Sequence, residues 1–310
     1  MDQPRCRVCA APADAPPAAH GERVYCERHS RRFFAWPRLA RQVTAVLTVG
    51  LLLFVGLVSL LAPMLNDALG HEGRIAAGLV LALVPAFLWL SVFSAQDREH
   101  PEPKLLLLKV FLLGALLAGA VGQPLITRLF RVSEWTAGSV AVRLAAGILV
   151  VGAIQEALKY AAVRHTVYGS REYDRPIDGI VYAAAAGLGY AMVIDVAFVV
   201  ENAGADLGGV ALRDTINSLA QASFAGITGY FLGRAKFDAR GPLWMPAGLA
   251  LACVLNGIVS TALGAVSRDG LKTTPARGLV LAACVAALTF GVLLALMHRH
   301  RAVHATGAAA

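Results

Sequence analysis

Eight apolar stretches of about 20 residues alternate with short polar segments along the chain. A helix of about 20 residues crosses the ~30 Å hydrocarbon core of a bilayer at ~1.5 Å per residue. The pattern therefore predicts an all-α fold: a polytopic membrane helix bundle of about eight transmembrane helices. The predicted spans are residues 43–64, 75–96, 105–127, 140–163, 179–201, 215–234, 243–265 and 277–298.

The spans divide the chain into a cytoplasmic N-terminal segment 1–40, a transmembrane domain 41–301 and a C-terminal tail 302–310. The first forty residues are polar and have no apolar h-region, so no cleavable signal peptide is expected. Composition agrees with a membrane protein. Hydrophobic residues make up 57% of the chain and charged residues 15%, against roughly 25% charged residues in soluble domains. A soluble secreted enzyme and a disordered chain are both excluded.

The distribution of basic residues predicts the orientation. When Lys and Arg in the first or last four positions of a span are counted with the adjoining segment, the N-terminal side holds 18 of these residues and the opposite side holds eight. Cytoplasmic loops are enriched in Lys and Arg, so this bias places both termini in the cytoplasm. The net charge of +8 is then mostly an orientation signal, and we expect no nucleic-acid partner.

The N-terminal segment carries a candidate zinc site, because Cys6, Cys9, Cys26 and His29 form two paired knuckles. Zinc prefers four N and S donors in a tetrahedron, and each C-x2-C or C-x2-H turn supplies two of them. Thiols stay reduced in the cytoplasm, which disfavours a disulfide. The pattern therefore predicts one structural zinc ion. The alternative is that the cysteines are incidental residues of a disordered tail.

Several polar residues lie inside the predicted spans, where an ionisable group costs several kcal/mol and needs a partner or a function. Glu156 and Lys159 are three residues apart, so one interpretation is an ion pair on one helix face. Because polar residues fall on four consecutive spans, they suggest one shared polar chamber. Its candidate members include Gln155, Glu156, Lys159, Asp195, Glu201, Asn217, Gln221 and Asn256.

Six short motifs in this region resemble those of the PrsW-type intramembrane metalloproteases, relatives of the CAAX-protease and bacteriocin-processing superfamily. The resemblance covers roughly residues 75–265. The motifs are the Asp97–Lys104 turn with Pro-Glu-Pro, Gln-Glu-Ala-Leu-Lys at 155–159, Asp-Gly-Ile-Val-Tyr at 178–182, Gly-Leu-Gly-Tyr-Ala at 187–191, Gly-Ile-Thr-Gly-Tyr-Phe-Leu-Gly at 226–233 and Leu-Asn-Gly at 255–257. The resemblance implies a PrsW-like transmembrane domain in a bacterial-type inner membrane.

The resemblance also implies a metal site, which this sequence changes. The family chemistry uses Glu-Glu-x-x-Lys, Phe-x-x-x-Glu-Asn and two later histidines. Here the carried-over catalytic candidates are Glu156 and Lys159, with Gln155 in place of the first glutamate. The former metal-ligand positions are Ile194, Gln221 and Asn256. Amides bind transition metals poorly and an alkyl group does not bind them, so a metal in the membrane core is doubtful.

The helical rise gives the expected depth of these positions. Ile194, Gln221 and Asn256 come out roughly 9–13 Å below the outer surface, in one layer, whereas Glu156 comes out roughly 24 Å below it. Glu156 reaches the layer if its span tilts or begins further out. Neither Asp195 nor Glu201 replaces the lost ligand simply, because the first faces elsewhere and the second lies ~10.5 Å further along the helix.

Three functions fit these observations. The first is a catalytically impaired protein of this lineage that binds a transmembrane protein partner. The second is an active intramembrane protease that cleaves a single-span membrane protein such as an anti-sigma factor, through Glu156 and an unanticipated ligand. The third is a small-solute transporter or channel lined by Asn217, Gln221 and Asn256. Whether the chain is an enzyme is left open by its sequence.

Overall fold

The computed structural model describes residues 26, 36–96, 102–202, 205–238, 240–268 and 276–307, and these contain helices and no strand. The helices are α2 (Trp36–Ala68), α3 (His71–Gln96), α4 (Lys104–Leu117), α5 (Val132–Trp135), α6 (Val140–Ala146), α7 (Ala153–Thr166), α8 (Pro176–Glu201), α9 (Leu207–Phe237), α10 (Trp244–Arg268) and α11 (Ala276–Gly307). Three wider π-helical segments, η1 (Ala118–Gly122), η2 (Leu125–Leu129) and η3 (Gly147–Gly152), extend α4 or lead from α6 into α7.

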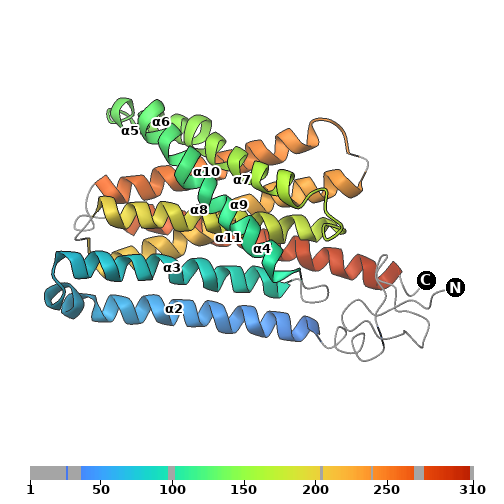
Figure 1. Ribbon diagram of the computed structural model, residues 1–310, viewed down its shortest axis with the longest axis horizontal. Coiled ribbons are helices and arrows are strands. Elements are labelled where there is room, and N and C mark those ends of the chain that lie inside the picture. The colour runs from blue at the N-terminus through green and yellow to red at the C-terminus, as the bar shows by residue number, and fades with distance from the viewer. Residues whose placement is uncertain are drawn as a thin grey trace.

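The long helices form one bundle (Figure 1). α2 and α3 lie side by side at one edge, and the α4 and α6–α7 segments cross the bundle obliquely. α8 and α9 form the centre, since α9 packs against α8, α2, α3, α10 and α11. α2 begins and α11 ends at the same end of the bundle. The all-α membrane bundle predicted from the sequence is confirmed.

The predicted count of eight apolar spans is wrong. Within the described residues, seven helices are long and apolar enough to cross a membrane. The predicted span 215–234 lies inside α9, which is not one of the seven. Polar residues such as Asn217 and Gln221 lower its hydropathy, yet both are buried. Other helices surround α9, so most of its side chains face protein rather than lipid and do not have to be apolar.

Close contact between α8 and α9 depends on facing glycines. A Cβ atom added to Gly229 of α9 would lie 2.1 Å from the carbonyl oxygen of Gly179 on α8. A Cβ atom added to Gly187 of α8 would lie 2.5 Å from the carbonyl oxygen of Gln221. The two backbones therefore approach without side chains between them, as small residues allow in membrane bundles. This approach fixes Gln221 against α8.

Polar contacts hold one end of the bundle together. Tyr182 of α8 donates a hydrogen bond to Glu102, which precedes α4. The Lys236 ammonium in the last turn of α9 donates to the carbonyl oxygens of Tyr168 and Tyr173, at 2.6 and 2.7 Å. Burial, followed by the negative charge of Asp178, raises the pKa of Tyr173 well above its usual value. The loop between α7 and α8 is therefore fixed to α9, which positions α7.

We predict that Gly229→Ala destabilises the protein and that Gly291→Ala does not. The new methyl group in Gly229→Ala would overlap the backbone of α8, and such overpacking costs about 1–3 kcal/mol. Gly291 is an exposed residue of α11 with nothing within 4 Å of an added Cβ, so alanine there is neutral or stabilising. Thermal unfolding of both purified variants in detergent would measure this. Equal melting temperatures would contradict the close α8–α9 contact.

Candidate functional site

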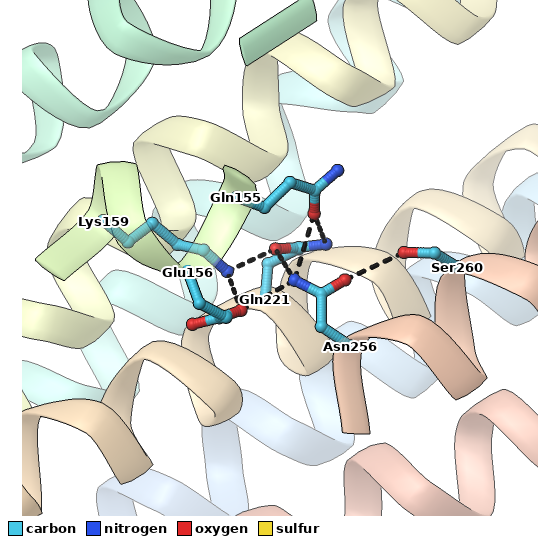
Figure 2. Close-up of polar contacts among 6 residues, drawn as sticks. All are labelled: Gln155, Glu156, Lys159, Gln221, Asn256 and Ser260. Atoms are coloured by element: carbon cyan, nitrogen blue, oxygen red, sulfur yellow. Dashed lines mark hydrogen bonds and ion pairs between the residues drawn. The ribbon is translucent and has the colours of Figure 1, made fainter. Parts of the chain in front are cut away.

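Five polar side chains from three helices meet in the interior and form what we call the core cluster (Figure 2). Gln155, Glu156 and Lys159 come from α7, Gln221 from α9 and Asn256 from α10. Each is at most 5% exposed, and Glu156 and Asn256 are fully buried. Figure 2 shows the five side chains pointing toward one another. The structure thus brings together five residues that the sequence singled out.

The Lys159 ammonium lies at the centre of the core cluster. Its Nζ atom donates to Oε1 of Glu156 at 2.5 Å and to Oε1 of Gln221 at 2.6 Å. The Glu156–Lys159 pair is the ion pair on one helix face that the sequence suggested. The contact with Gln221 adds a link from α7 to α9.

The three amide side chains complete the hydrogen-bond network. Asn256 Nδ2 donates to Glu156 Oε1 at 2.6 Å and to Gln155 Oε1 at 3.0 Å. Gln221 Nε2 also donates to Gln155 Oε1, at 3.1 Å. The amides act as donors and acceptors at once, so they satisfy one another in a buried setting.

Sequence reasoning missed Ser260, which orients Asn256. The Ser260 hydroxyl donates to Asn256 Oδ1 at 2.8 Å, so the amide nitrogen of Asn256 faces Glu156 and Gln155 (Figure 2). Ser260 is four residues after Asn256 on α10, which places both side chains on one helix face. That spacing was the available signal.

Glu156 lies at the level of Gln221 and Asn256, because it contacts Asn256 directly. A constant helical rise per residue had predicted a deeper position in the membrane for Glu156. The difference has two causes: the α6–α7 segment is oblique to the bundle (Figure 1), and η3 immediately precedes α7. A π-helical turn holds more residues than an α-helical turn, so it also changes which face of the following helix points inward.

Asp195 and Asn217 belong to a second cluster, between α8 and α9. Asp195 accepts hydrogen bonds from Asn217 at 2.7 Å, Arg213 at 3.1 Å and Ser218 at 3.3 Å. Arg213 also pairs with Asp214 at 2.8 Å. The single chamber suggested by the sequence is therefore divided into two hydrogen-bonded groups. Arg213 falls in the loop between the predicted spans 179–201 and 215–234, but the structure places it in α9 as a buried residue, 7% exposed.

The two remaining candidates contribute no polar contact to the core cluster. Ile194 is half-buried on α8 and has no polar atom in its side chain. Glu201 is exposed at the end of α8.

The donor atoms of the core cluster do not suit a catalytic transition metal. Zinc in proteins takes His, Cys or carboxylate ligands at about 2.0–2.3 Å, whereas this cluster offers three neutral amides, one carboxylate and an ammonium. Nowhere in the described part of the chain do three His, Cys, Asp or Glu side chains group closely enough to hold a metal. The Lys159 Nζ contacts also direct positive charge at the oxygens a metal would need.

A narrow gap borders the core cluster beside Lys159. The gap beside Lys159 is too narrow to hold a water molecule. It is lined by Lys159, Tyr160, Val163, Ala183, Ala225, Thr228, Gly229 and Leu232. Of the five core-cluster residues, Lys159 alone lines this gap.

The predicted zinc knuckle stays a prediction. Cys6, Cys9 and His29 lie outside the described residues, and so does the connector to α2. Cys26 is described and is half-buried.

Known proteins resemble this chain over most of its membrane domain. It is 30% identical over 191 residues to Protease PrsW of Geobacillus kaustophilus, which covers 61% of this chain and 80% of that protein. It is 28% identical to Protease PrsW of Oceanobacillus iheyensis, over 64% of this chain and 87% of that protein. It is 27% identical to Protease PrsW of Bacillus subtilis, over 60% of this chain and 82% of that protein. No solved structure matches.

The family model described as PrsW family intramembrane metalloprotease matches residues 102–297. That range runs from Glu102, two residues before α4, to Met297 within α11, and it includes every residue of the core cluster. The chain is an integral membrane protein and belongs to the PrsW family of intramembrane metalloproteases.

Proposed function

We propose that this chain is a non-proteolytic member of the PrsW family that binds a single-span membrane protein. The observation that carries the proposal is the position of Lys159, which donates to both Glu156 and Gln221 within 2.6 Å. A metalloprotease uses a carboxylate to take a proton from a metal-bound water. Here the corresponding carboxylate is engaged by an ammonium and an amide.

The burial of Glu156 supports the same conclusion. Its side chain is 0% exposed, and the adjacent gap beside Lys159 does not admit water. Gln155, Gln221 and Asn256 are amides, which are weak ligands for zinc. The amide side chains and the burial of Glu156 both support a non-proteolytic function.

Partner binding is supported by the fold. The relatives are named proteases, and a protease must bind a protein before it cleaves. The match continues from Glu102 to Met297, so the helices that would hold a transmembrane substrate are present. Fold alone does not fix the chemistry, and binding can outlast catalysis.

A second candidate function is an active protease, and one observation favours it. Glu156 Oε2 has no hydrogen-bond partner within the described residues, so one oxygen of the carboxylate could accept a proton. This function would require the core cluster to open and to take a ligand from elsewhere.

We predict that co-expressed single-span membrane proteins remain uncleaved by the wild-type chain, and that Glu156→Gln does not change this. The expected result follows because Glu156 lacks a metal-bound water to activate. Glu134→Gln, at an exposed ion pair with Arg131, is the matched carboxylate control. Fragment sizes on immunoblots and photo-crosslinking of the uncleaved partner would measure cleavage and binding separately. Cleavage that Glu156→Gln abolishes and Glu134→Gln preserves would establish the active protease instead.

We also propose that the protein lies in a bacterial cytoplasmic membrane, with the loop between α7 and α8 on the cytoplasmic side. The charge bias of the sequence supports this orientation. We predict that Ser133→Cys, at an exposed position in α5, reacts with a membrane-impermeant maleimide on intact cells. Gly169 is exposed in the loop between α7 and α8, and this loop lies at the opposite end of the bundle from α5 (Figure 1), so Gly169→Cys should react only after lysis. The wild-type chain is the background control, and the reverse labelling pattern would invert the orientation.

For the N-terminal segment we propose one structural zinc held by Cys6, Cys9, Cys26 and His29. We predict that full-length protein contains about one zinc per chain and that Cys26→Ser loses it, because a structural site needs all four ligands. Cys284→Ser, an exposed residue of α11, is the matched control and should keep the zinc. Elemental analysis of the purified proteins decides this, and equal zinc content in the two variants would refute the knuckle.

A further inference from the structure

We infer that the Lys159 ammonium is the resident cation of the core cluster, placed where the family name implies a metal. It joins α7 to α9 and balances the single negative charge of Glu156. This inference concerns the same cluster as the proposed function but does not require it. A chain that kept this ammonium-centred core and still cleaved a substrate would retain the inference and lose the proposed function.

The charges of the core cluster are balanced without a metal ion. Glu156 and Lys159 are 0% and 1% exposed, and the other three members of the core cluster are neutral. The cluster therefore has no net charge as it stands. A bound divalent cation would leave two uncompensated positive charges away from water, which is strongly unfavourable in a low-dielectric interior.

Nearly every carboxylate and amide oxygen of the core cluster already accepts a hydrogen bond. Lys159 Nζ donates to Oε1 of Glu156 and to Oε1 of Gln221. Gln155 Oε1 accepts from two amides, and Asn256 Oδ1 accepts from Ser260. Glu156 Oε2 is the one carboxylate or amide oxygen of the cluster without a partner in the described residues. One available oxygen does not make a four-coordinate zinc site.

The Lys159 ammonium lies between several helices. Besides its contacts on α7 and α9, Lys159 Nζ lies 5.7 Å from the ring centroid of Tyr190 on α8, within cation–π range. Asn256 of α10 binds the same Glu156 oxygen as Lys159. The ammonium therefore contacts groups on α7, α8 and α9 directly and is linked to α10 through Glu156.

Metal binding gives the first test. The full chain with Cys26→Ser, which removes the predicted N-terminal site, is titrated with cobalt(II) alone and then desalted. We expect no retained cobalt and no cobalt d–d absorption bands. About one cobalt per chain, lost on adding Glu156→Gln, would overturn the inference, because a divalent ion would then share the site with Lys159.

A double-mutant cycle gives the second test. Lys159→Met and Glu156→Gln should each lower the melting temperature, on the order of 10 °C, because each strands a buried partner. The double variant should recover much of the loss, because it leaves neither charge behind. Lys109→Met, an exposed lysine of α4, is the control and should melt as the wild type does.

The cycle remains decisive if the single variants fail to fold. In that case, the amount of folded double variant in the membrane should exceed that of either single variant. Strictly additive losses, or a double variant that is worse than both singles, would show that the pair does not act as a unit. Either result would remove Lys159 from its role as the resident cation.

Discussion

A pair of opposite charges away from water is the constraint on which the rest of this structure depends. Lys159 and Glu156 are 1% and 0% exposed, and neither could be buried without the other. The pair also needs polar neighbours to satisfy its remaining atoms, and Gln221 and Asn256 supply them from α9 and α10. The position of α7 relative to two other helices therefore follows from one electrostatic requirement.

The same requirement explains why the central helix α9 is not among the seven helices apolar enough to count as membrane spans. α9 carries Gln221 toward the core cluster and Arg213 and Asn217 toward Asp195. A helix with these side chains is tolerated in a membrane because protein surrounds it on most sides. The glycine contacts between α8 and α9 bring the two backbones close enough for short side chains to reach across. Polarity and close packing are thus two parts of one arrangement.

The sequence predicted seven of the long apolar helices, because hydropathy depends on residues that are near one another in the chain. The sequence pattern counted α9 as an apolar span. The pattern of one helix does not reveal that other helices surround it and allow it to be more polar. The residues of the core cluster were identified from the cost of polar groups in a membrane, and one shared chamber was predicted for them. The separation of Asp195 and Asn217 into a second cluster was not predicted. Two π-helical segments follow α4, and a third leads into α7. A π-helical turn changes both the rise per residue and the direction in which the following side chains point. A constant rise per residue therefore predicted too great a depth for Glu156. Arg213 was assigned to a loop for the related reason that a buried ion pair leaves no apolar signal.

The chemistry of the side chains explains how protein groups alone hold the helices together at the core cluster. Carboxylates and imidazoles that converge in a membrane repel or remain unsatisfied unless a cation holds them together. Amides carry both donors and acceptors, so Gln155, Gln221 and Asn256 satisfy one another directly. Only Glu156 then needs a positive partner, and Lys159, one helical turn away, provides it. The amides and the Glu156–Lys159 pair therefore link α7, α9 and α10 through direct hydrogen bonds between side chains.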